Sequence, residues 1–157
     1  MSAVSTSTDI RSLLKLALPI GSRLITGHPD TPVNWVCNLR TRPPIFADIE
    51  GGELVLLSTA TLSNYQKPLT LETVIEELVQ TRASALAVRG TIMPRAHQVA
   101  KSANFPVIVL PDRAVLPQVE RAVQRLLTNH QAQLAHRAFE LQQTLQRLSL
   151  IHISEPT

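Results

Sequence analysis

Three short apolar runs, separated by two segments with helical patterning, constrain the fold of this chain more than any other feature. The runs are residues 54–57, 85–88 and 107–110. Unbroken runs of this length are typical of strands buried on both faces, as in a parallel sheet. Between them, residues 71–79 and 94–103 carry apolar side chains at helical spacing. Successive strand–helix–strand units predict an α/β fold: a small, mostly parallel sheet with flanking helices.

Local signals predict where the helices of this fold begin. Thr70 can cap the first of the two, because its hydroxyl can accept a hydrogen bond from a first-turn N–H. Pro94 can start the second, since a missing N–H costs nothing in the first turn. Further upstream, Thr8 can cap a helix that ends at Pro19. The apolar face of that helix consists of Ile10, Leu13, Leu14, Ala17 and Leu18.

Two more strands are expected before the three buried ones, and the sequence does not reveal the order of the strands in the sheet. Residues 22–26 are a short strand candidate. In residues 33–40 apolar and polar side chains mostly alternate, which predicts a strand with one buried face. That face would carry Val33, Trp35, Cys37 and Leu39. Cys37 is then a small buried side chain rather than a nucleophile.

From Leu116 onward the chain changes character, and a long helix over residues 115–147 is expected. After Pro117 this segment contains neither glycine nor proline. Two interpretations of its apolar stripe stay open: it packs on its own sheet, or it pairs with a second copy in a two-stranded coiled coil. The second interpretation predicts a homodimer through the C-terminal helix. Its contact residues would be Leu127, Leu134, Ala138, Leu141 and Leu145.

Both termini are expected to lie outside the folded unit. Residues 1–8 are small and polar, which predicts a disordered tail. Residues 148–157 resemble the translation of a transposase adapter used to make sequencing libraries. We therefore expect the natural sequence to diverge near Arg147 and the gene to continue. The folded part then divides into an α/β domain, 9–114, and a linker helix, 115–147.

Composition excludes several classes of function. Hydrophobic residues make up 44% and charged residues 17% of the 157 residues, which is typical of a globular chain. No apolar run approaches the roughly 18 residues of a membrane span, and no signal peptide is visible, so a cytoplasmic protein is expected. The net charge of +3 and the 3% of aromatic residues argue against a surface built for nucleic acid.

No pattern of titratable residues points to catalysis, so we expect no enzyme, no cofactor and no metal site. The glycine-rich phosphate-binding motifs are absent from the sequence. His130 and His136 are six positions apart and do not share a helix face for a metal. The strand ends offer Ser58, Arg89 and Pro111 rather than aspartates, which argues against a phospho-receiver domain.

Open α/β sheets bind ligands outside the carboxyl ends of their strands, and this rule gives a candidate site for a small-molecule effector. Arg89 could hold an acidic molecule through its guanidinium, beside the open backbone of Gly90. The alternative is that Arg89 pairs with a surface acid such as Glu53 or Asp112. The candidate residues are Ser58, Thr59, Arg89, Gly90, Thr91 and Asp112.

Five segments in a fixed order carry a family resemblance. They are IGSRLITG at 20–27, PVNWV at 32–36, GGELVL at 51–56, ALAVRG at 85–90 and FPVIVLP at 105–111. Together with the long helix, this combination resembles the N-terminal domain of PucR-like regulators, the purine catabolism regulator family of bacteria. The resemblance covers nearly all of the natural chain.

The resemblance implies a bacterial transcriptional regulator of which this domain is the N-terminal sensory module. It would relay metabolite binding, or dimer geometry, through the long helix to a helix-turn-helix domain. No helix-turn-helix is visible here, so DNA would be contacted only by a domain absent from this chain. Many members carry a His and a Ser-Glu pair after Trp-Val, whereas residues 37–40 are Cys, Asn, Leu and Arg. We therefore transfer no effector-binding residue. The alternative is a non-sensing dimerisation or interaction module.

Overall fold

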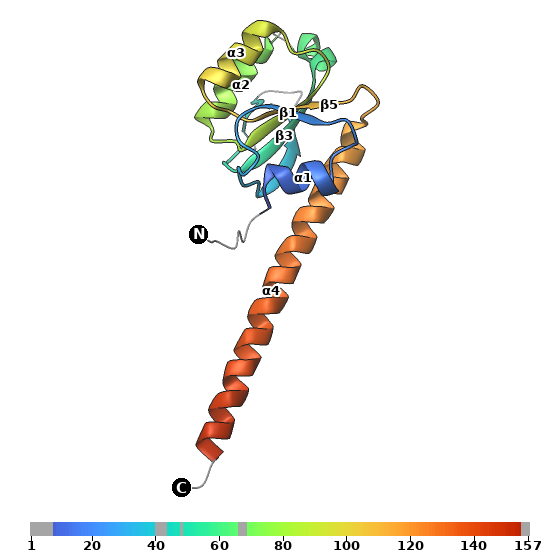
Figure 1. Ribbon diagram of the computed structural model, residues 1–157. Coiled ribbons are helices and arrows are strands. Elements are labelled where there is room, and N and C mark those ends of the chain that lie inside the picture. The colour runs from blue at the N-terminus through green and yellow to red at the C-terminus, as the bar shows by residue number, and fades with distance from the viewer. Residues whose placement is uncertain (1–7, 40–43, 48, 66–68, 155–157) are drawn as a thin grey trace.

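A single five-stranded sheet organises the computed structural model, in the order β1-β5-β4-β3-β2 (Figure 1). β1 runs antiparallel to β5, and all other neighbours are parallel, which confirms the predicted fold class. The strands are β1 (Arg23–Thr26), β2 (Trp35–Asn38), β3 (Glu53–Ser58), β4 (Ala85–Arg89) and β5 (Val107–Leu110). The structure describes residues 8–39, 44–47, 49–65 and 69–154, with the backbone alone for Leu134 and residues 147–154.

Helices cover both faces of the sheet and make three layers (Figure 1). α2 and α3 pack on one face, and α1 and the first turns of α4 pack on the other. The helices are α1 (Ile10–Leu16), α2 (Leu71–Gln80), α3 (Pro94–Ser102) and α4 (Leu116–Ser154), and a 3₁₀ helix, η1 (Thr59–Asn64), follows β3. The first turn of η1 lies at the carboxyl end of β3, where the sequence carries no recognised helix signal.

Side-chain alternation along the central strands divides the interior into two cores. In β3, Val55 and Leu57 face α2 and α3, whereas Leu54 and Leu56 face α1 and α4. Every residue of β3 is buried, as the continuous apolar run predicts. The same alternation in β4 places Ala85 and Ala87 on the α4 side and Leu86 and Val88 on the α2–α3 side.

The predicted cap of α2 and the predicted start of α3 are confirmed, but the predicted cap of α1 is wrong. Thr70 accepts a hydrogen bond from the Thr73 N–H at 3.2 Å, and Pro94 opens α3. The residue that caps α1 is Asp9, whose carboxylate accepts from the Ser12 N–H at 2.9 Å. Thr8 does not cap α1, because it is buried and pairs with the strand-like segment before β2 through its own carbonyl oxygen.

The face of residues 33–40 that was predicted to be buried is buried at Val33 and Leu39, but the expectation of a single buried face is wrong. Val36 is fully buried against the α1–α4 core, while Cys37 is half-buried against the α2–α3 core. Trp35, predicted to be buried, is 47% exposed at the start of the strand. The reason is that β2 is an edge strand of a sheet covered on both faces, so neither face is purely polar.

The first part of α4 confirms that the apolar stripe packs on its own sheet, and pairing with a second copy stays a prediction. Val119, Val123 and Leu127 are buried in the core of the helix's own domain. Beyond Leu127 the helix projects from the domain (Figure 1), and its described side chains are mostly exposed. Its 39 residues correspond to about 58 Å.

Candidate functional site

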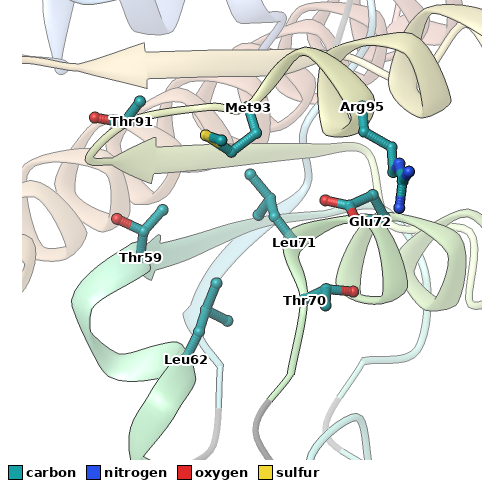
Figure 2. Close-up of a pocket in the computed structure, with 8 residues that line it drawn as sticks. All are labelled: Thr59, Leu62, Thr70, Leu71, Glu72, Thr91, Met93 and Arg95. Carbon is teal, nitrogen blue, oxygen red and sulfur yellow. The ribbon is translucent and has the colours of Figure 1, made fainter.

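A cavity of about 440 Å³ lies at the carboxyl edge of the sheet, and we call it the edge cavity (Figure 2). Its volume falls within the range of about 300–1,000 Å³ that is usual for small-molecule sites. The cavity lies between the N-terminal ends of α2 and α3, and η1 forms a further wall (Figure 2). Its lining residues are Thr59, Leu62, Thr70, Leu71, Glu72, Thr91, Met93 and Arg95.

The parallel strand order explains why these segments meet. β3 leads through η1 to α2, and β4 leads directly to α3, so both helices start at the carboxyl edge. Thr59 and Leu62 come from η1, and Thr91 and Met93 come from the loop after β4. The cavity therefore combines apolar side chains with threonine hydroxyls.

The electrostatic character of the edge cavity comes from the two helix starts. The first turns of α2 and α3 present backbone N–H groups and the positive ends of the helix dipoles. Glu72 adds a carboxylate and Arg95 a guanidinium, one from each first turn. Tyr65, which directly follows η1, is buried in the core on the α2–α3 side of the sheet, and this burial raises the pKa of its phenol.

Gly90 keeps the ends of β3 and β4 close together beside the cavity. Its φ of +129° lies in a backbone region that residues other than glycine rarely adopt. A Cβ atom at this position would lie 2.0 Å from Oγ1 of Thr59, so a larger residue would have to push the cavity wall outward.

The six predicted ligand residues do not form one site, because they lie on opposite faces of the sheet and in a turn. Thr59 and Thr91 line the edge cavity, and Gly90 packs against Thr59. Ser58 and Arg89 lie on the opposite, α4-facing side, because Arg89 continues the alternation of Ala85 and Ala87 in β4. Asp112 is exposed in the turn between β5 and α4.

Arg89 has a structural environment of its own. Its Nη1 donates to the carbonyl oxygen of Ala114 at 2.7 Å, and its Nη2 donates to Oγ of Ser58 at 3.3 Å. Among the residues that the structure describes, neither Glu53 nor Asp112 forms an ion pair with it. Glu53 lies at the other edge of the sheet, where its carboxylate accepts from the N–H groups of Glu50 and Gly51.

Most of the cavity lining was absent from the sequence-based site. Leu62, Thr70, Leu71, Glu72, Met93 and Arg95 line it in addition to the two threonines. The starts of α2 and α3 were visible in the sequence at Thr70 and Pro94. In a parallel α/β unit those starts share an edge with the strand ends, and this rule could have found the first-turn residues.

The stripe predicted for dimerisation is divided between two environments. Leu127 is buried in its own domain. Ala138, Leu141 and Leu145 are exposed on the projecting part of α4, with each of the two leucines 66% exposed. The described part of Leu134 is its backbone, so its side chain lies outside the described residues.

Two further observations concern ligands and membranes. Within the described ranges, no group of three His, Cys, Asp or Glu side chains could hold a metal ion. In the same part of the chain, no helix has the length and apolarity needed to cross a membrane.

The fold and the edge cavity thus define a three-layer α/β domain with a small-molecule-sized cavity and a projecting terminal helix. The model of the purine catabolism regulatory protein-like family matches residues 12–127, which is most of the chain. The chain therefore belongs to this family, as its sequence segments predict. Its class is that of a regulatory domain. No curated protein matches the chain significantly.

A solved structure gives a more distant comparison. The chain is similar to the CBS and DRTGG domains of the regulatory region of Clostridium perfringens pyrophosphatase, determined in complex with the activator diadenosine tetraphosphate. The identity is 17% and the TM-score 0.47, over 74% of this chain and 51% of that one. This chain therefore spans about half the length of that structure. Similarity at this level carries no inference about a ligand.

Proposed function

We propose that this chain is the N-terminal sensory module of a bacterial transcriptional regulator, and that the edge cavity binds its small-molecule effector. The observation that supports this most is a ligand-sized cavity at the carboxyl edge of the sheet, in a member of a regulatory family. The module is a binding protein rather than an enzyme, and it acts in the cytoplasm.

The lining of the edge cavity suggests how an effector would be held. Leu62, Leu71 and Met93 offer apolar contacts to the body of a small molecule. The threonine hydroxyls and the charged side chains of Glu72 and Arg95 offer polar contacts that would orient it. No effector-binding role is assigned to Arg89, because its guanidinium is already bonded on the opposite side of the sheet.

α4 is the route by which binding would reach a helix-turn-helix domain beyond this chain. Its first turns pack on the sheet through Val119 and Val123, and the remainder projects (Figure 1). A change in the position of these first turns would be carried along the helix as a rigid element. Effector binding would then bias two placements of α4 relative to the sheet.

A second candidate function is dimerisation without sensing, and the exposed leucines of α4 favour it. Leu141 and Leu145 share one face of the projecting helix with Ala138. Pairing with a second copy of the chain would cover this face as a coiled coil. The two functions are compatible, because dimerisation uses the projecting half of α4 and sensing uses the sheet domain.

Calorimetric titration of the chain with purine bases and uric acid, the compounds to which the family name points, tests the proposal. We expect at least one of these probes to bind. Thr91→Phe should weaken that binding at least about tenfold, because the new ring occupies the edge cavity. The matched control is Thr128→Phe, at an exposed position of α4 outside the cavity. Binding that Thr91→Phe leaves unchanged would move the site elsewhere, and no binding by any probe would favour the dimerisation function.

A further inference from the structure

The carboxyl ends of three neighbouring strands form one aligned row in the sheet. Ser58 of β3 pairs with Arg89 of β4, and Arg89 pairs with Leu110 of β5. One residue further along, β3 leads into Thr59, which lines the edge cavity, and β4 leads into Gly90, which packs against Thr59. The third strand enters the turn that leads to α4. Arg89 is the middle residue of this row.

The side chain of Arg89 links the end of β3 to the turn between β5 and α4, on the α4 side of the sheet. One arm of its guanidinium reaches the carbonyl oxygen of Ala114, two residues before α4 begins, and the other reaches Oγ of Ser58. Ala114 is buried, so its carbonyl oxygen needs this donor. The guanidinium is a planar group with fixed donor directions, so a shift of either partner moves the other or breaks a bond.

On the cavity side, the same strand ends are in tight contact. Thr59 leaves no room for a side chain at position 90. The segments that follow β3 and β4 therefore cannot move toward each other independently. Thr59 directly follows Ser58, and Gly90 directly follows Arg89. A ligand that displaces Thr59 or Thr91 would therefore shift the backbone beside Ser58 and Arg89. Of these two residues, Arg89 holds the carbonyl oxygen of Ala114, and Ser58 accepts a hydrogen bond from Arg89.

We propose that Arg89 is a coupling residue that transmits displacement of the cavity wall to the start of α4. This inference rests on the proposed function in one respect, namely that the edge cavity takes an occupant. It assigns Arg89 to regulation of the site rather than to contact with the ligand. The coupling runs through the two hydrogen bonds of Arg89 and the close approach of Gly90 to Thr59.

A covalent occupant allows the coupling to be tested without a known effector. The probe is a benzyl group attached with benzyl methanethiosulfonate to Thr91→Cys, in a Cys37→Ser background. Hydrogen–deuterium exchange of residues 116–127 is measured with and without the label. We expect the label to change exchange in the first turns of α4 by about fivefold, the lower end of typical allosteric coupling.

Arg89→Gln should abolish this response to the label. The matched control is Arg113→Gln, which removes the arginine next to Ala114 in the turn before α4, one that donates to the carbonyl oxygen of Ile20. The control should keep the response. A response that persists in full in Arg89→Gln, or a label that leaves α4 unchanged when Arg89 is present, would overturn the proposal. If Arg89 had only a structural role, Arg89→Gln would change the exchange of residues 116–127 by the same amount with and without the label.

The folding of each variant is checked by far-ultraviolet circular dichroism. If Arg89→Gln does not fold, Ser58→Ala removes only one of the two hydrogen bonds and should reduce the response to the label. An undiminished response in Ser58→Ala would then count against the coupling. Failure of the calorimetric titration with purine probes would instead affect the proposed effector, since the label response does not depend on it.

Discussion

Gly90→Ala is the change whose cost follows most directly from the geometry of the candidate site. The substitution has two separate costs. The first is conformational, because Gly90 has a φ of +129°. The second is steric, because the new Cβ would lie 2.0 Å from Oγ1 and 3.1 Å from Cβ of Thr59. Either the wall of the edge cavity or the end of β4 must move.

The magnitude of each cost can be set from general values. A residue held in a sparsely populated backbone region costs about 1–3 kcal/mol. Overpacking at a well-fitted position costs about 1–3 kcal/mol in addition. We therefore expect Gly90→Ala to lower the free energy of unfolding by about 2–6 kcal/mol.

Gly51→Ala is the matched control for the conformational cost. Gly51 has a φ of +124°, but its new Cβ would meet no atom closer than 3.7 Å. It should therefore cost only about 1–3 kcal/mol. The difference between the two variants isolates the contact with Thr59, and we expect it to be about 1–3 kcal/mol.

Urea unfolding followed by circular dichroism measures both variants. Repeating the pair in a Thr59→Ala background removes Oγ1, so the difference between them should shrink by more than half. If Gly90→Ala costs no more than Gly51→Ala, or if Thr59→Ala leaves the difference unchanged, the close packing of Gly90 on the cavity wall is refuted.

Three further predictions concern a titration, a helix cap and the oligomeric state. Burial raises the pKa of Tyr65 above its ordinary value near 10, so the folded state holds the phenolic proton more tightly than the unfolded state. The contribution of Tyr65 to the free energy of unfolding is therefore complete below pH 10 and is lost as the pH rises through the raised pKa. Ultraviolet titration of this single tyrosine should show the raised pKa, and an ordinary pKa would contradict the prediction. Asp9→Ala should lower the free energy of unfolding by about 1 kcal/mol in urea and Asp9→Asn much less, whereas equal losses would argue against the cap. In sedimentation velocity, Leu141→Asp should shift a dimer toward monomer and Gln143→Asp, on another side of α4, should not; unchanged sedimentation of Leu141→Asp would exclude this face as the interface.

The periodicity of the sequence predicted the central strands and helices well, because each is buried either on both faces or on one face only. Strands buried on both faces give continuous apolar runs, as in β3, and amphipathic helices give a clear stripe, as in α2. The position of β1 could not be predicted, because its antiparallel pairing with β5 depends on contacts between distant segments. The prediction for residues 33–40 was correct for the burial of Val33 and Leu39 but wrong for Trp35, and it missed the burial of Val36 on the other face of the edge strand β2.

The candidate site was predicted in its location but not in its full composition. The rule for open α/β sheets identifies the edge that carries Thr59 and Thr91, but it does not say which face each residue points to. The alternation of Ala85, Ala87 and Arg89 in the sequence contains that information. The contribution of η1 was not predicted, because no helical stripe marks it and its N-cap residue, Ser58, makes no side-chain cap bond.

The central claim is that the edge cavity binds a small molecule, and its most direct test is a ¹H–¹⁵N correlation spectrum of the chain with and without each purine probe. The account predicts that a binding probe shifts the amides of residues 59–62, 91–93 and 95 most strongly, with smaller shifts at 114–116, 118 and 119. Shifts confined to other parts of the sheet domain, or shifts on the projecting half of α4 alone, would contradict it.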